Sequence, residues 1–254
     1  TDNTTDGTRE IFASNDLRPR DVRFLTSTPA GLLFSGYNDD AGSELWVVTV
    51  ANFNFYEDGS TLFTELHEAG QIVTVAAIEN GYTLTLSEGI WQGTNSPNVI
   101  GDGTSTLNVT ATGLNAFNTV SIDDTATGTG VTFTDSGLNT YGDSFDILLD
   151  EAGAGTITFN GATVLTDSAA LSASTSRNIM VTAGAVVKTH DGGLTLSANQ
   201  QETPASGNFH GVFVNGGNVE VTGSGNLVVY GTGGDTGDYN YGVIAYQGGR
   251  ILGG

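Results

Sequence analysis

Hydrophobic and polar residues alternate with a period of two along most of this chain, in short segments bounded by Gly, Asn, Asp or Ser. Such alternation predicts half-buried β-strands. The most helix-like stretch, LFTELHEAG at Leu62–Gly70, is short, so we predict an all-β chain. Fifteen strands are expected, in the segments QIVTVAAI, YTLTLSEGIW, STLNVTAT, NTVSI, VTFTDSG, DILLD, TITFNG, NIMVTAG, AVVKTH, LTLSA, GVFVNG, NVEVTG, NLVVYG, GVIAYQ and RIL.

An internal repeat decides how these strands are arranged. Residues 193–221 align with residues 226–252, and Leu194 matches Leu227 at a spacing of 33 residues. Each unit contains three strands, with a long polar loop (ANQQETPASGNFH or GTGGDTGDYN) between the first and the second. Short strands alone would fit a sandwich or a coil, but a repeat of this length favours a coil of stacked turns with one protruding corner per turn.

We therefore predict a parallel β-helix or β-solenoid, right-handed by expectation, preceded by a small antiparallel β unit. The expected boundaries are residues 1–50 for the first unit, 51–79 for a connector or cap, and 80–254 for the solenoid. The last strand, RIL, ends in the middle of a repeat by this register. Such an edge exposes unpaired N–H and C=O groups, so we expect further protein or a partner to cover it.

The first 50 residues differ in composition from the rest of the chain and carry four of its seven basic residues. Asp6-Gly7-Thr8, the stretch GLLFSGYNDDAGSELW and Glu44-Leu45-Trp46 resemble the ELWxxDGT repeat of extracellular bacterial proteins, which implies a blade-like β unit. Val48-Thr49-Val50 stands where the next DGT would follow. One repeat cannot close a propeller, so we expect either the last unit of an array or a cap on the coil.

A second resemblance covers about residues 70–254. YTLTLSEGIWQGTNSPNVIGDGTSTLNVTATG, LTLSANQQETPASGNFHGVFVNGGNVEVTGSGN and GTGGDTGDYNYGV are similar to units of long β-strand-repeat surface proteins, of the filamentous-haemagglutinin and autotransporter-passenger kind found in planctomycetes and other aquatic bacteria. The resemblance implies an extracellular or cell-surface location and an adhesin, matrix or filament role. It implies no shared catalytic residues.

Composition narrows the range of functions. Seven Lys and Arg stand against 28 Asp and Glu, for a net charge of −21, and cysteine is absent. The charge disfavours nucleic acids and other polyanions, while the missing thiols exclude disulfides and cysteine metal sites. No apolar run approaches the roughly 18 residues of a membrane span. The start, TDNTTDGT, lacks the features of a signal peptide, so we expect a mature or trimmed piece.

Right-handed β-helices include galacturonan hydrolases, which as a family use a DD pair, a GHG and an RIK on neighbouring turns. This chain offers, in that order, Asp123-Asp124, His210-Gly211 and Arg250-Ile251. However, 86 residues separate Asp124 from His210, Phe209 replaces the first glycine of GHG, and Leu252 replaces the lysine of RIK. We interpret Asp123-Asp124 as a turn and His210 as a loop-edge residue, and we predict no catalytic residues and no enzyme activity.

Calcium is the better candidate ligand, because hard oxygen donors are abundant. The loop GTGGDTGDYN offers Asp235 and Asp238 as candidate Ca²⁺ ligands, with glycines that let backbone carbonyls converge. Turn geometry alone also explains Asp and Gly there. Further acidic clusters are Asp39, Asp40 and Glu44, and Asp146, Asp150 and Glu151.

Aromatic residues suggest contact surfaces. Tyr239 and Tyr241 lie on the protruding corner, where burial within one turn is difficult, and we predict that they form an association surface with Arg250 and Ile251 of the last strand. The other candidate aromatics, for core packing, sugar stacking or subunit contact, are Phe53, Phe55, Tyr56 and Trp91. The main hypothesis is a structural or adhesive protein that associates head to tail through its β-edges. The alternative is a glycan-binding or glycan-cleaving β-helix, which would need aromatics and carboxylates gathered along one sheet.

Overall fold

The computed structural model describes residues 20–28, 31–38, 42–48, 54–110, 116–150 and 155–254, the first three segments as backbone only. The chain divides into two compact units, residues 1–52 and 53–254. Every regular element among the described residues is a β-strand, which confirms the all-β prediction. The described residues accordingly contain no helix that could cross a membrane.

The first unit contains an antiparallel sheet of three strands, β1 (Arg20–Thr28), β2 (Gly31–Asn38) and β3 (Gly42–Val48). The backbone of Phe34 lies opposite that of Trp46 in the β2–β3 pair. The ELW residues, 44–46, therefore lie inside β3, whereas the DGT residues, 6–8, fall outside the described part of the chain. This sheet agrees with a small antiparallel β unit.

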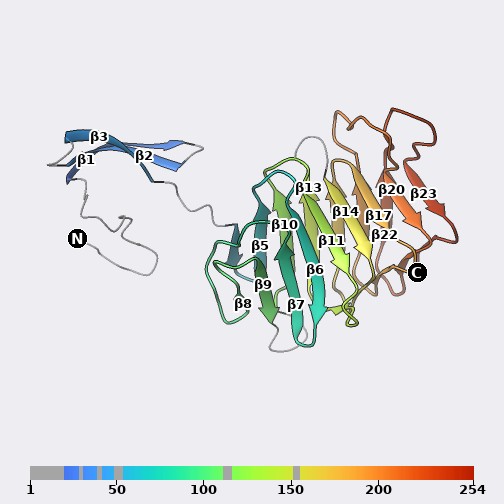
Figure 1. The fold of residues 1–254 in the computed structure, drawn as a ribbon. Helices are drawn as coiled ribbons and strands as arrows, with labels where there is room; N and C mark the ends of the chain where they lie inside the picture. Colours follow the sequence, from blue (N-terminus) through green and yellow to red (C-terminus); the bar gives the residue numbers. More distant parts are fainter. Residues whose placement is uncertain (1–19, 29–30, 39–41, 49–53, 111–115, 151–154) are drawn as a thin grey trace. The chain divides into compact units, whose positions relative to one another are not determined.

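Three sheets make up the second unit (Figure 1). The seven-stranded sheet contains, in spatial order, β22 (Leu227–Gly231), β19 (Leu194–Ala198), β16 (Leu171–Thr175), β13 (Ser144–Leu149), β10 (Thr119–Asp124), β5 (Thr61–Leu66) and β4 (Phe55–Asp58). The nine-stranded sheet contains β23 (Val243–Tyr246), β20 (Val212–Asn215), β17 (Asn178–Val181), β14 (Thr156–Asn160), β11 (Gly130–Thr134), β6 (Ile72–Ile78), β7 (Gly81–Leu86), β9 (Thr106–Thr110) and β8 (Val99–Ile100). The five-stranded sheet contains β12 (Thr140–Tyr141), β15 (Ala162–Leu165), β18 (Val186–Thr189), β21 (Asn218–Val221) and β24 (Arg250–Leu252).

The chain visits the three sheets in a fixed order. From β10 onward, each set of three consecutive strands places one strand in each sheet, and each strand pairs in parallel with its counterpart in the next set. We call each set a turn; the last turn is β22, β23 and β24. β5 and β6 pair in parallel with β10 and β11 and so precede the first full turn.

The predicted alignment of the last two units is confirmed by the pairing. Leu194 of β19 lies beside Leu227 of β22, and Val219 of β21 lies beside Ile251 of β24. The polar loops 199–211 and 232–242 connect the first and second strands of these turns, and Figure 1 shows both extending past the strands near the C-terminal end.

Antiparallel strands complete the other end of the sheets. β4 pairs with β5, and β7 and β9 extend the nine-stranded sheet beyond β6. Phe55 of β4 and Trp91 are fully buried there, and the Trp91 indole N–H donates to the Leu84 carbonyl at 3.0 Å. This end of the core is therefore covered by side chains of the same chain.

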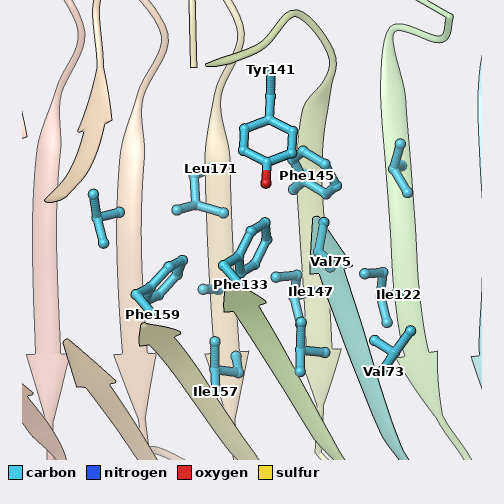
Figure 2. Close-up of a cluster of buried hydrophobic side chains, with 14 of the residues drawn as sticks. Val73, Val75, Ile122, Phe133, Tyr141, Phe145, Ile147, Ile157, Phe159 and Leu171 are labelled. Carbon is cyan, nitrogen blue, oxygen red and sulfur yellow. The ribbon is translucent and has the colours of Figure 1, made fainter. Parts of the chain in front are cut away.

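The core lies between the sheets and is continuous along them, because every second residue of each strand points inward. One part of it is aromatic, where Phe133, Tyr141, Phe145 and Phe159 gather (Figure 2). Phe133 stacks on Phe159 of the next turn, with ring centroids 5.0 Å apart, and meets Phe145 and Tyr141 edge to face at 5.4 and 6.0 Å. Offset and edge-to-face contacts of this kind stabilise packing beyond the area they bury.

Glycine permits the turns to stack closely at one corner. A Cβ atom on Gly192 would lie 2.0 Å from the Ala169 carbonyl oxygen, and one on Gly225 would lie 2.1 Å from the Gly192 carbonyl oxygen. The backbones of three successive turns thus contact one another directly at this corner, and only glycine fits at the second and third of these positions.

Candidate functional site

An open groove crosses the outer face of the seven-stranded sheet where β4, β5 and β10 lie side by side. Its volume is about 260 Å³, close to the lower end of the range for small-molecule pockets, about 300 to 1,000 Å³. The lining residues are Asn54, Tyr56, Phe63, Thr64, Glu65, Ser121 and Asp123. Strand alternation explains why Phe63 and Glu65 line the groove, because Leu62 and Leu66 of β5 point into the core.

One wall of the groove is a pair of stacked aromatic rings. Tyr56 of β4 is the register partner of Phe63 of β5, and the ring centroids lie 4.9 Å apart with the planes inclined by 13°. Tyr56 is 49% exposed, which is high for a ring of this size. The pair presents an apolar surface to solvent beside polar neighbours.

The adjoining part of the groove is acidic. Asp123 of β10 is the register partner of Glu65 of β5, so both carboxylates project from the same face of adjacent strands. Partial burial raises the pKa of Asp123; the N–H of Asp124, 2.8 Å away, opposes the shift, and the charges of Asp150 and Asp146 add to it. The basic residues described in the second unit, Arg177, Lys188 and Arg250, do not line the groove.

Carboxylate oxygens of Asp123, Asp124 and Asp150 lie within 4.8 Å of one another beside the groove. Such oxygens are the donors that Ca²⁺ prefers. Asp124 is buried, however, and accepts a short hydrogen bond from the Thr129 hydroxyl, so at least one of its oxygens already has a protein donor. The interpretation of Asp123-Asp124 as a turn is wrong: both residues end strand β10, because β5 and β13 pair with it on either side.

The pattern similar to galacturonan hydrolases is not assembled into one site. Asp123 and Asp124 lie on β10, whereas His210 precedes β20 in a later turn. In the seven-stranded sheet β13 and β16 separate β10 from β19, the strand that leads to the His210 loop. At about 4.8 Å per strand, three strand spacings amount to roughly 14 Å. Arg250 is farther still along the chain, in β24 of the five-stranded sheet.

Asp235, the first candidate calcium ligand, holds two loops together. Its carboxylate accepts hydrogen bonds from the Ser206 hydroxyl at 3.1 Å and from the Gly207 N–H at 3.0 Å. The bond from Gly207, followed by that from Ser206, lowers the pKa of Asp235. The loop 232–242 is thereby tied to the loop 199–211 of the preceding turn. Asp238, the second candidate, is exposed in the same loop, and a Ca²⁺ role for the two remains a prediction.

The predicted association residues lie on the last turn. Tyr239 is 76% exposed with a φ of 67°, and Tyr241 contacts the ring of His210, 5.6 Å between centroids. Arg250 is exposed, whereas Ile251 points inward and packs against the core while remaining partly accessible. Other exposed aromatic residues of this turn are Tyr230 and Tyr246.

A second cavity, of about 210 Å³, lies near Tyr82, Tyr141 and Asp143. Asp143 is buried, accepts the Tyr82 hydroxyl at 2.7 Å and the Phe117 N–H at 3.1 Å, and joins β7 to the first turns. We assign this pair a structural role, because both carboxylate oxygens have partners within the protein.

Sequence reasoning named Tyr56 as a candidate contact residue but missed the groove, because the groove depends on β5, which was the most helix-like stretch of the chain. One signal was present. Asp58-Gly59 lies between two alternating segments, and Gly59 has a φ of 60°. A DG pair in that context is a strong indication of a β-hairpin, here β4–β5.

Comparison with protein-family models, with curated proteins and with solved structures finds no match for this chain. The functional argument therefore starts from the fold and from its surfaces.

Proposed function

We propose that residues 53–254 form a parallel β-solenoid, and that the protein is a non-enzymatic structural or adhesive module of an extracellular surface protein. The fixed order of strands through three parallel sheets and the single core shared by all turns support the solenoid. In such a fold each turn is stabilised mainly by its neighbours, which produces a stiff, elongated element suited to a fibre or a surface stalk.

The association role rests on the open backbone edges at both ends of the three sheets of residues 53–254, and the last turn illustrates them. β22, β23 and β24 are the outermost strands of their sheets, each with one neighbour among the described residues. Their inward side chains are partly buried or exposed, whereas the register partners one turn earlier are almost completely buried. These half-covered residues include Leu227, Val229 and Ile251.

A second copy of the chain is the partner that we propose for this surface. Each sheet also has an outermost strand at its other end, namely β4, β8 and β12. Strand addition between the last turn of one copy and one of these edge strands of the next would pair backbone groups and shield part of the apolar surface of the last turn. Because the two contact surfaces differ, repeated pairing is heterologous and extends into an open fibre.

An acidic exterior is consistent with a location in saline extracellular water, where salt screens its self-repulsion. The resemblance of residues 70–254 to surface-protein repeats also supports this location. We further propose that Ca²⁺ favours association by reducing repulsion between acidic copies, with Asp235 and Asp238 as the candidate ligands.

Sedimentation velocity and electron microscopy test the association. The wild-type chain is expected to form concentration-dependent oligomers or filaments, more readily with Ca²⁺ than with a chelator. Val229→Lys places a charge among the inward residues of the last turn and should keep the chain monomeric. Val228→Lys, one residue away on the outer face, is the matched control and should associate like wild type.

A wild-type chain that stays monomeric at several hundred micromolar with and without Ca²⁺ would exclude this role. Equal association of the two lysine variants would exclude the last turn as the contact surface. Circular dichroism of each variant separates a loss of association from a loss of folding.

A further inference from the structure

The groove on the seven-stranded sheet lies at the opposite end of that sheet from the last turn, on the outer face of β4, β5 and β10. Strand pairing in a fibre would use the backbone edge of β4, whereas the groove is built from side chains on the face of the sheet. It combines an exposed aromatic pair with acidic groups, on three hydrogen-bonded strands of the same sheet. A fibre needs neither feature at this place. The combination points to a ligand with an apolar face and a periphery of hydrogen-bond donors.

We propose that this groove binds a pyranose unit of a neutral or amine-bearing glycan, with Tyr56 and Phe63 contacting the C–H face of the ring and with Glu65 and Asp123 accepting hydrogen bonds from its hydroxyl or ammonium groups. The volume of about 260 Å³ suits a ligand of about one ring at a time. The inference does not require fibre formation.

The aromatic pair supplies the apolar contact. The C–H face of a pyranose packs on flat aromatic surfaces, and tyrosine offers such a surface with little loss of side-chain entropy. Tyr56 is 49% exposed and stacks on Phe63 with ring centroids 4.9 Å apart, so each ring holds the other in place before a ligand arrives. Pre-organisation of this kind lowers the entropic cost of binding.

The carboxylates provide hydrogen-bond acceptors and determine which ligand charge the groove favours. Glu65 and Asp123 are neighbours in register, and Asp146 and Asp150 add negative charge near Asp123. Among the described residues, the imidazole of His67 lies beside Glu65. Its Nδ1 is 3.8 Å from a Glu65 oxygen and 3.0 Å from the Thr125 hydroxyl. A carboxylate accepts strong hydrogen bonds from hydroxyl and ammonium donors.

Charge complementarity identifies the glycan class. Arg177 lies over the Phe209 ring, 5.2 Å from its centroid, and Lys188 pairs with Glu220 at 3.3 Å, so these cations are engaged elsewhere. The groove is lined by the carboxylates of Glu65 and Asp123 and by no Lys or Arg. It therefore repels anionic ligands such as uronates and sulfated sugars. It accepts neutral sugars, and amino sugars more strongly, because an ammonium group relieves the repulsion between the carboxylates.

Isothermal titration with four hexasaccharides tests the proposal: cellohexaose, N-acetylated chitohexaose, fully deacetylated chitohexaose and hexagalacturonate. At low salt we expect binding of the first three, tightest for the deacetylated, amine-bearing oligomer, and no binding of hexagalacturonate. Binding of the amine should weaken as salt increases, whereas binding of cellohexaose should change little.

Variants locate the site. Tyr56→Ala and Phe63→Ala should each weaken binding about tenfold. Asp123→Asn should weaken the amine-bearing oligomer about tenfold and the neutral oligomers about threefold or less. Tyr230→Ala removes a 59% exposed tyrosine from β22 of the same sheet and is the matched control, with wild-type affinity expected. Phe63→Leu keeps an apolar side chain there should the alanine variant unfold.

Three results would overturn the proposal: no binding of any non-anionic oligomer, binding that Tyr56→Ala and Phe63→Leu leave unchanged, or equal binding of hexagalacturonate. A titration with Ca²⁺ alone can give a fourth result that would overturn the proposal. If Ca²⁺ binds, Asp123→Asn abolishes that binding, and no oligosaccharide binds, the acidic groups serve a cation and the glycan assignment fails. Sedimentation of the same variants keeps the result separate from that of fibre formation.

Discussion

The hydroxyl of Tyr82 donates a hydrogen bond of 2.7 Å to the carboxylate of Asp143, 61 residues later in the chain, and both side chains are buried. The bond joins β7, an antiparallel strand at the covered end of the core, to the short connection between β12 and β13. Burial and the Asp143 charge raise the pKa of Tyr82, so its hydroxyl remains a donor at every physiological pH. This pair joins the covered end of the core to the first turns.

Removal of this hydroxyl should destabilise the protein. Tyr82→Phe keeps the ring but leaves one oxygen of Asp143 without its donor, which costs about 1 to 3 kcal/mol of unfolding free energy. Denaturant unfolding followed by fluorescence measures the change. Tyr56→Phe, which removes an exposed hydroxyl, is the control and should lie within about 0.5 kcal/mol of wild type.

Acidification from neutral pH should stabilise the fold. Burial raises the pKa of Asp143, so the folded chain binds a proton there more readily than the unfolded chain. The stabilising effect is complete below the unfolded value, about 3.9, and is lost as pH rises through the folded value. Asp191 and Asp235 have lowered pKa values, so they contribute stability that is lost on acidification, as pH falls below about 3.9.

We therefore expect the melting temperature by calorimetry to rise as the pH is lowered from 7.5 to about 4. Asp143→Asn cannot titrate and should show a smaller rise, whatever its own stability at pH 7.5. An identical rise in wild type and variant would assign the effect to the general reduction of net charge instead.

The aromatic centre of the core should dominate stability. Phe133→Ala removes the ring that contacts Phe159, Phe145 and Tyr141 and leaves a cavity in the middle of the parallel sheets, at a cost of about 3 to 5 kcal/mol. Phe133→Leu should cost less, because part of the volume is kept. Equal costs for the two variants would mean that the surrounding turns collapse into the space.

Hydrogen exchange should show that the turns differ in local stability. In monomeric protein the amides of β22 have a neighbouring strand on one side only, whereas those of β19 lie between β16 and β22. We expect β22, β23 and β24 to exchange first, as a unit, because end turns lack one of the two interfaces that stabilise internal turns. Under associating conditions protection of these amides should increase.

Much of the fold was predictable because each strand carries its own alternation. All fifteen segments expected from the sequence contain strands, and the match of Leu194 with Leu227 became a register pair. The strands that sequence reasoning missed show where local signals fail. β16, Leu171–Thr175, consists largely of serine and alanine, which have low β propensity. It is a strand because β13 and β19 pair with it on both sides.

The candidate site was less predictable, because it depends on which turns become neighbours. Asp123 and Asp150 were recognised separately as acidic positions, but their proximity follows from the pairing of Asp123 with Leu148 across two turns. Phe63 lay in the helix-like stretch and carried no signal of its own. Once the register of parallel strands is known, both placements follow directly from the alternation of faces.

The turns of this chain differ in length without any change in strand spacing. Phe145 pairs with Leu171, 26 residues on, and Leu171 pairs with Leu194 after 23, yet Leu194 pairs with Leu227 after 33, with much of the extra length in the loop 199–211. Successive turns are therefore spaced about 4.8 Å apart by backbone hydrogen bonds, whatever the length of their loops. Foreign sequence grafted into that loop would be displayed at a known height along the axis, and the gap between two such grafts could be set by counting turns.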